Sequence, residues 1–327
     1  MERDTVMTAT PTLDAGLTDA GLTDTASCAT PSRTEVSPLL PVLAALAAVV
    51  LWGGAFPAMK VAVQTLGTWQ MMWARMVFAL LLLVPLARRL APARIERRDL
   101  PLLAGMALMQ PCLYFLCEST ALQLTTSSQA GVMAASMPLM MAVGGFLLGE
   151  KVSPRLWFGV GVSCIGVAWL TSSGGEGGGS APDPFTGNLL ELAAMACATG
   201  SSLCIGALIS RGKGRWNALT LTGIQTLAGA VFFLPGAPGV IGGVADWSTE
   251  VLLAVVYLGG ASSLGAFGLY NWALGHMPAS RAGNFINLVP VAAIFFGWLL
   301  LGETLTTTQY LATGLVMGGV LMGTRAR

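Results

Sequence analysis

Long stretches without charged side chains alternate with short charged clusters along most of the chain. A membrane helix needs about 20 mostly apolar residues to cross roughly 30 Å of hydrocarbon, and several of these stretches are that long. The stretch at residues 119–149 is longer, and a Thr/Ser turn at 125–127 divides it between two spans. The pattern predicts an all-α integral membrane protein with ten transmembrane helices. The predicted spans are residues 39–61, 69–87, 101–122, 128–148, 154–172, 187–209, 217–236, 250–272, 280–301 and 307–324.

Composition excludes a soluble protein. Of the 327 residues, 54% are hydrophobic and 10% charged, whereas an ordinary soluble domain is about a quarter charged. The 17 Lys and Arg residues are nearly balanced by 16 Asp and Glu residues, so no basic excess points to nucleic acid.

The positions of the cations predict the topology, because Lys and Arg near span ends stay on the cytoplasmic side. With the N-terminus inside, the outside loops hold no cation. We therefore expect a multi-pass protein of the bacterial inner membrane with both termini cytoplasmic. Thirteen cations fall on the inner side: Arg88, Arg89, Arg94, Arg97, Arg98, Lys151, Arg155, Arg211, Lys213, Arg215, Arg281, Arg325 and Arg327.

Two polar segments predict the domain organisation. Residues 1–37 are rich in Thr, Ala, Asp and Pro without the apolar core of a signal peptide, which predicts a disordered cytoplasmic tail. Residues 173–186 are rich in Gly, Ser and Pro and predict an outside linker. The linker separates a first repeat at 38–172 from a second at 187–327.

The two halves repeat one sequence unit. SQAGVMAASMPLMMAVGGFLLGE (128–150) aligns with SRAGNFINLVPVAAIFFGWLLLGE (280–303) at an offset of 152 through Pro138 and Pro290, and of 153 at Glu150 and Glu303. Five predicted spans per half, an odd number, place the second copy upside down. Inverted repeats are typical of alternating-access transporters. We interpret the Gly-Glu pairs that close each copy as helix ends with capping interactions.

These motifs resemble the EamA family of the drug/metabolite transporter superfamily. The resemblance rests on WGGAFPAMK (52–60), on the two repeat units, and on LGETLT (301–306), and it covers nearly all of residues 39–324. It implies ten helices, a central cavity lined mainly by helices 1–4 and 6–9, and peripheral helices 5 and 10. It also implies export of amino acids or other small metabolites, and the members compared are proton-driven.

The clearest ionisable residues within the predicted spans are Lys60, Arg75 and Glu118. A charged side chain there costs about 2.5–3.5 kcal/mol even on lenient scales, so it normally faces a partner or a polar cavity. All three fall in the outer half of the first repeat. We hypothesise that Glu118 neutralises one cation and that the other docks a substrate carboxylate. The alternative is a structural salt bridge with Lys60 extended towards the interface.

Four-residue spacing places these charged residues on the same helix faces as other candidate substrate-binding residues. Trp52 and Phe56 share a stripe with Lys60, and Gln110 and Tyr114 share one with Glu118. Such stripes suit a cavity that holds a zwitterion, although aromatic stripes also serve packing or lipid contact.

The second half adds neutral candidates and one acid. Pro85 matches Pro235 at an offset of 150, which places Gln225 opposite Arg75. Asn284 and Asn287 precede Pro290, where interhelical hydrogen bonding is the simpler explanation. Glu191 either stabilises a helix N-terminus or takes part in a proton relay.

No catalytic, metal or cofactor site is expected. The chain has one histidine and lacks HExxH, paired Cys/His spacing and a phosphate-binding loop. A channel is disfavoured because the chain carries its own two-fold repeat. Two GxxxG spacings near the C-terminus allow close contact within the fold or in a homo-oligomer. The sequence thus predicts a secondary transporter that exports small metabolites with protons across the lipid bilayer. An uptake carrier or facilitator, or an intramembrane enzyme, is the alternative.

Overall fold

A computed structural model describes residues 37, 39–89, 95–149, 151, 153–173, 181–212, 216, 218–274, 276–277 and 285–324. These residues form helices and turns, with no β-strand among them, so the predicted all-α class is confirmed. Residues 1–36 of the predicted tail, residues 174–180 of the predicted linker, Glu150 and Asn284 lie outside the described ranges. The α-helices are α1 (Leu39–Leu83), α2 (Leu100–Ala107), α3 (Tyr114–Leu124), α4 (Ser127–Ala134), α5 (Met137–Leu147), α6 (Pro154–Ser172), α7 (Pro184–Gly212), α8 (Ala218–Phe232), α9 (Ala237–Gly243), α10 (Thr249–Val256), α11 (Phe267–Leu274), α13 (Val289–Leu301) and α14 (Thr307–Thr324).

Short helical turns join some of these helices into longer units. The wide turn η2 (Leu108–Leu113) joins α2 to α3, and η6 (Tyr257–Ala266) joins α10 to α11. The tighter turns are η1 (Val84–Arg89), η4 (Leu234–Gly236) and η5 (Val244–Asp246).

The count of ten separate spans is only partly confirmed. Among the described residues, six helices are long and apolar enough to cross a membrane, or seven if the segments Leu219–Phe232 and Leu234–Asp246, bent by 53°, form one span. The ninth predicted span is described over residues 285–301, and its helix α13 has 13 residues because a turn at residues 287–288 precedes it.

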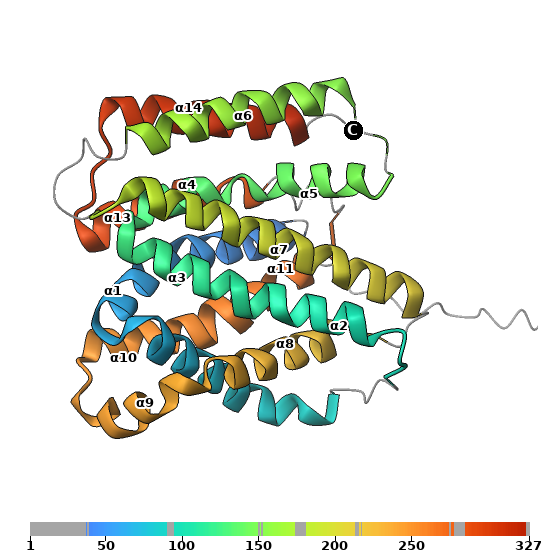
Figure 1. Ribbon diagram of the computed structural model, residues 1–327, viewed down its shortest axis with the longest axis vertical. Coiled ribbons are helices and arrows are strands. Elements are labelled where there is room, and N and C mark those ends of the chain that lie inside the picture. The colour runs from blue at the N-terminus through green and yellow to red at the C-terminus, as the bar shows by residue number, and fades with distance from the viewer. Residues whose placement is uncertain are drawn as a thin grey trace, which may run out of the picture. The chain divides into compact units, whose positions relative to one another are not determined.

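The first two predicted spans are joined more tightly than expected. A straight helix of the 45 residues of α1 would be about 68 Å long, roughly twice the hydrocarbon thickness. Gly67 breaks it with φ 72° and ψ 168°, a backbone conformation that side chains with a Cβ rarely adopt. The chain turns back at this point (Figure 1), so a single residue replaces the predicted loop.

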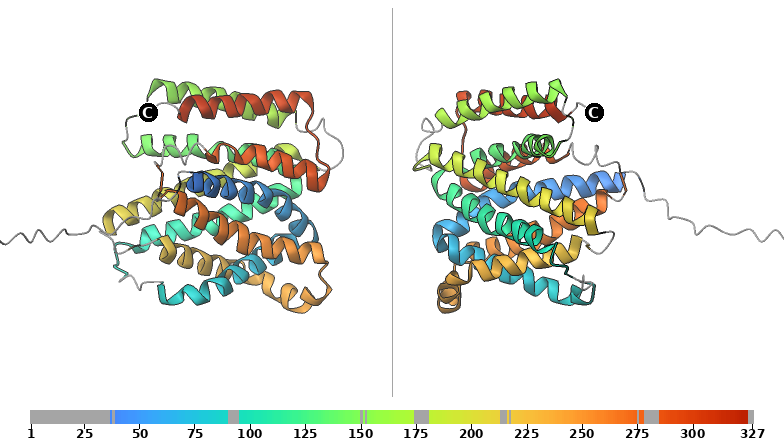
Figure 2. Two further views of the ribbon diagram at one scale, coloured as in Figure 1. Left: turned by 180° about the vertical axis from the view of Figure 1, so that it is seen from behind. Right: turned by 45° about the vertical axis from the view of Figure 1, so that its right-hand side comes forward.

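The last helices of the two repeats, α6 and α14, pack side by side at one edge of the bundle (Figures 1 and 2). A Cβ on Gly319 would lie 2.5 Å from the backbone nitrogen of Ser163 and 2.6 Å from the carbonyl oxygen of Gly159. The contact therefore requires glycine. Gly314 and Gly318, in contrast, have no atom within 4 Å of an added Cβ. One of the two GxxxG spacings thus serves the fold itself.

Both repeats interrupt a helix at the matched prolines. The helix α5 begins at Met137 and α13 at Val289, each one residue before its proline. Proline is favourable in the first turn of a helix because its missing N–H has no partner there. The main core combines residues of both halves, among them Met71, Leu122, Phe233, Leu258 and Ala293.

Candidate functional site

A buried ion pair joins the two repeats at one end of the bundle. The Lys60 ammonium lies 3.2 Å from Glu303 Oε1 and donates to the Thr125 carbonyl oxygen at 2.9 Å. The side chains of the pair are only 4% and 2% exposed. Of the two cations considered for pairing with Glu118, Lys60 instead pairs with Glu303 of the second repeat.

Glu303 also caps a helix of the opposite repeat. Its carboxylate accepts hydrogen bonds from the backbone N–H and hydroxyl of Ser127, both at 2.8 Å, and from those of Ser128 at 2.9 and 2.8 Å. These groups begin α4, where free N–H groups favour an anion. Burial alone would raise the pKa of Glu303, which lies in the loop after α13. The hydrogen bonds from Ser127 and Ser128 and the charge of Lys60 outweigh this effect and hold the pKa below its usual value.

A second buried cation, Arg75, lies between the two repeats. Its Nε and Nη2 atoms donate to Ser263 Oγ in η6 at 3.3 and 3.2 Å. The guanidinium also lies over the ring of Phe115, 4.3 Å from its centroid, in a cation–π contact. Arg75 is 5% exposed, and its Nη1 has no hydrogen-bond partner among the described residues. One of the two terminal nitrogens of the guanidinium is thus left without a hydrogen bond to the described residues.

An acidic group faces the same region from α3 and α7. Tyr114 donates to Glu118 Oε1 at 2.6 Å, as their four-residue spacing predicts. Glu118 is 4% exposed and acts electrostatically on Arg75, but its Oε2 has no hydrogen-bond partner in the described chain. Glu191 of α7 is fully buried, and neither of its carboxylate oxygens has a partner there. We define Arg75, Tyr114, Glu118 and Glu191 as the polar cluster.

A break in the third span adjoins this cluster. Gln110, in η2, has an extended backbone (φ −142°, ψ 119°), which frees carbonyl groups from the helix. The Gln225 amide donates to the Gln110 carbonyl at 2.9 Å and to Ser201 Oγ at 3.2 Å. Irregular backbone at membrane depth is tolerated where protein groups satisfy it, and it often marks a binding region in transporters.

Other predicted site residues lie apart from the polar cluster. Trp52 packs on Phe267 and Tyr270, with ring centroids 5.1 and 5.4 Å away. Phe56 is buried in the main core, and Asn287 is 4% exposed in the turn before α13. Of the stripe predicted on the first span, Trp52 and Phe56 therefore pack against other side chains, and Lys60 forms the ion pair.

Two interaction partners are not predicted from the sequence: Ser263, which accepts hydrogen bonds from Arg75, and Glu303, which pairs with Lys60. Ser263 carries no signal that separates it from other small residues of η6. The aligned repeats do contain a signal for Glu303, because each half presents a Ser (Ser128, Ser280) at the start of the unit and a Glu (Glu150, Glu303) at its end.

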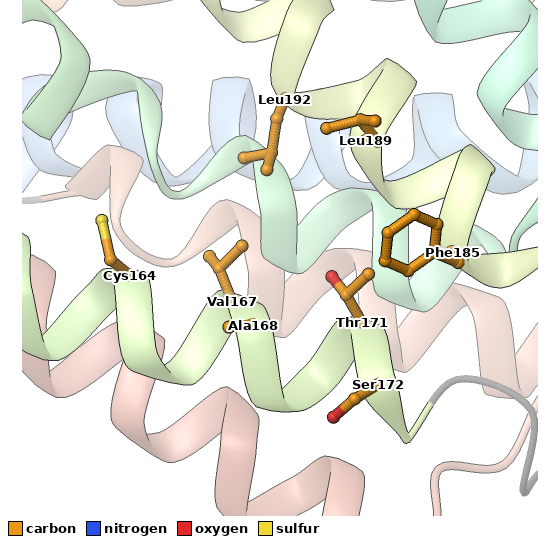
Figure 3. A pocket seen from close by; sticks show the side chains of 8 residues that line it. All are labelled: Cys164, Val167, Ala168, Thr171, Ser172, Phe185, Leu189 and Leu192. Atoms are coloured by element: carbon orange, nitrogen blue, oxygen red, sulfur yellow. The ribbon is translucent and has the colours of Figure 1, made fainter.

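A cavity of about 380 Å³ lies elsewhere, between α6 and α7 (Figure 3). Leu189, Leu192 and Phe185 of α7 line it opposite Val167 of α6, with Thr171 at one end. Its walls hold no charged side chain, so it offers no group to orient an ionic metabolite. The polar cluster is the better candidate site.

Both halves of the chain match the model of one protein family. The model of the EamA-like transporter family matches residues 39–172 and again residues 186–325. The chain belongs to the EamA-like transporter family. It is accordingly a multi-pass membrane protein of a transporter family, in which a small molecule is the substrate.

Named relatives share a quarter of their sequence with this EamA-like protein. An "uncharacterized inner membrane transporter YedA" of Escherichia coli K12 is 26% identical over 88% of this chain and 91% of its own length. A "probable terminal-alkyne amino-acid exporter" of Streptantibioticus cattleyicolor is 25% identical over 86% and 92%. A solved crystal structure with 20% identity and a TM-score of 0.55 covers 86% of this chain and 95% of the other, and shows the same fold.

Proposed function

We propose that this EamA-like protein exports amino acids or related zwitterions, by alternating access and in exchange for protons. We place it in a bacterial inner membrane with both termini cytoplasmic, so that Lys60 and Glu303 lie at the outer end. The positive-inside distribution supports this orientation. The name of the Streptantibioticus relative supports an amino-acid substrate.

The observation that carries the proposal is a pair of opposite charges with unsatisfied atoms inside the membrane. Nη1 of Arg75 and Oε2 of Glu118 are buried without hydrogen-bond partners among the described residues. Leaving buried charged groups unsatisfied costs more than about 1–3 kcal/mol each, which a ligand recovers when it supplies the missing bonds. A substrate carboxylate fits Nη1 and a substrate ammonium fits Oε2.

The binding residues come from segments that a rocking motion would separate. Arg75 and Glu118 belong to the first repeat, whereas Ser263 and Gln225, which bond to Arg75 and to the broken helix, belong to the second. A substrate held by this cluster is therefore positioned to favour one arrangement of the repeats over the other.

Flux in proteoliposomes tests the proposal. Labelled amino acids are screened by counterflow, and any hit is then assayed with an imposed pH gradient. We expect saturable, trans-stimulated flux that is driven uphill by protons. Unsaturable flux would indicate a pore, and flux that ignores the gradient would indicate a facilitator.

Two variants and a control locate the site. Arg75→Gln and Glu118→Gln each remove one charge of the cluster and should raise the half-saturating concentration. Losing a hydrogen bond to a charged group costs about 1.5–3 kcal/mol, or roughly ten- to a hundredfold in affinity. Lys151→Gln removes an exposed cation and should change nothing. Wild-type affinity in both cluster variants would refute the assignment.

A further inference from the structure

Glu191 is buried more completely than a helix-terminal acid should be. The helix α7 begins at Pro184, so Glu191 lies seven residues in, about two turns from the N-terminus. The favourable effect of the helix dipole on an anion fades within the first turn. Stabilisation of a helix end, one of the two roles considered for this residue, therefore does not account for it.

The surroundings of Glu191 offer a carboxylate no compensation. Its relative exposure is 0%, and both oxygens lack hydrogen-bond partners in the described part of the chain. An ionised carboxylate in such a place costs several kcal/mol, whereas the neutral acid costs far less. The geometry thus favours the protonated form of Glu191 in this conformation.

Glu118 differs from Glu191 in its partners. It accepts a hydrogen bond from Tyr114 at 2.6 Å and interacts electrostatically with Arg75, and both interactions favour its ionised form. The helices α3 and α7 pack together, and the charge of Glu118 acts on Glu191. Two neighbouring carboxylates that share a buried site do not readily ionise together.

The ionisable groups around this pair are few. Those that act on Glu191 come from α3: Glu118, Tyr114 and Cys117. The described residues of α2, α4 and α5, which also pack against α7, contain no Asp, Glu, Lys, Arg or His. The remaining neighbours contribute Arg155 at one end of α6, Cys164 on α6, and Cys112 in η2.

We propose that Glu191 is the proton carrier of the transport cycle and that Glu118 is the ionised partner that binds the substrate ammonium. When the ammonium neutralises Glu118, the O–H bond of Glu191 breaks, its proton passes to water on the cytoplasmic side, and the carboxylate remains. After the substrate leaves outside, Glu191 takes a proton from outside water. One proton enters for each substrate exported. This deepens the proposed function and rests on it.

Infrared spectroscopy of the purified protein tests the resting state without a substrate. We expect a protonated carboxylic acid band at neutral pH that disappears in Glu191→Gln and shifts in Glu191→Asp. Thr199→Val is the matched control, because Thr199 is a buried residue of α7 whose hydroxyl also lacks a described partner. A band unchanged in Glu191→Gln, or absent from the wild type, would overturn the proposal.

Transport separates this inference from the proposed function. Glu191→Gln should lose accumulation driven by a pH gradient, whereas Glu191→Asp, which keeps a carboxyl that can bind and release a proton, should retain it in part. Coupled accumulation that survives in Glu191→Gln, or that is lost equally in Glu191→Asp, refutes the role of Glu191 alone. Absence of coupled flux in the wild type refutes the proposed function and this inference together.

Discussion

Replacing Glu303 with alanine tests how strongly the two repeats are held together at one end. The change removes a carboxylate that accepts four hydrogen bonds from Ser127 and Ser128 and pairs with Lys60 at 3.2 Å. All these groups are buried, so water does not readily replace the lost interactions.

The magnitude follows from two overlapping losses. Removing one partner of a buried ion pair costs about 3–5 kcal/mol, because the other charge stays buried. Removing a helix cap costs about 0.5–2 kcal/mol. Because both effects act through the same oxygens they are not additive, and we expect Glu303→Ala to lower the free energy of unfolding by about 4 kcal/mol. Glu303→Gln keeps one acceptor oxygen and should lose about 2 kcal/mol.

Unfolding in mixed micelles with increasing SDS, followed by tryptophan fluorescence, measures the effect. The control is Glu250→Ala, which removes an exposed acid from the first turn of α10 and should change stability by less than about 0.5 kcal/mol. Lys60→Met combined with Glu303→Gln should cost less than the two single changes summed, because no charge is left behind. A loss below about 1 kcal/mol in Glu303→Ala would refute this reasoning.

Three further predictions follow from named contacts. The pKa of Glu303 is lower in the folded protein than its value of about 4.3 in the unfolded chain, so the stabilisation that Glu303 contributes is complete above pH 4.3 and is lost as the pH falls through the folded-state pKa. SDS unfolding between pH 7 and 3 should show this loss of stability in the wild type, and the loss should be absent in Glu303→Gln. Gly319→Ala should lower the free energy of unfolding by about 1–3 kcal/mol, because the added Cβ forces α6 away from α14. Gly314 has open space around it, so Gly314→Ala should leave the free energy of unfolding unchanged or raise it by up to about 1 kcal/mol. The same SDS unfolding assay compares the two variants. Ser263→Ala removes the recorded hydrogen-bond acceptor of Arg75, and an increase in the half-saturating substrate concentration should accompany it in counterflow.

The sequence predicted the helical segments well because uncharged runs of membrane length have few alternative structures. Local spacing also predicted the Tyr114–Glu118 contact. The partner of Lys60 was not predictable in this way, since Glu303 lies 243 residues away and only the packing of the repeats brings them together. The interruption of the helix at Gln110 was not predictable from the sequence, because an apolar segment has the same residue pattern whether its backbone is helical or locally extended.

The position of Glu303 affects how the protein is made. Helix α4 begins at Ser127, but the carboxylate that completes it is synthesised 176 residues later. Until that residue leaves the ribosome and enters the bilayer, Lys60 lacks this counter-charge and α4 lacks this cap. The N-terminal half therefore reaches its final form only after Glu303 has been synthesised, and a chain truncated before Glu303 should be a ready target for membrane proteases.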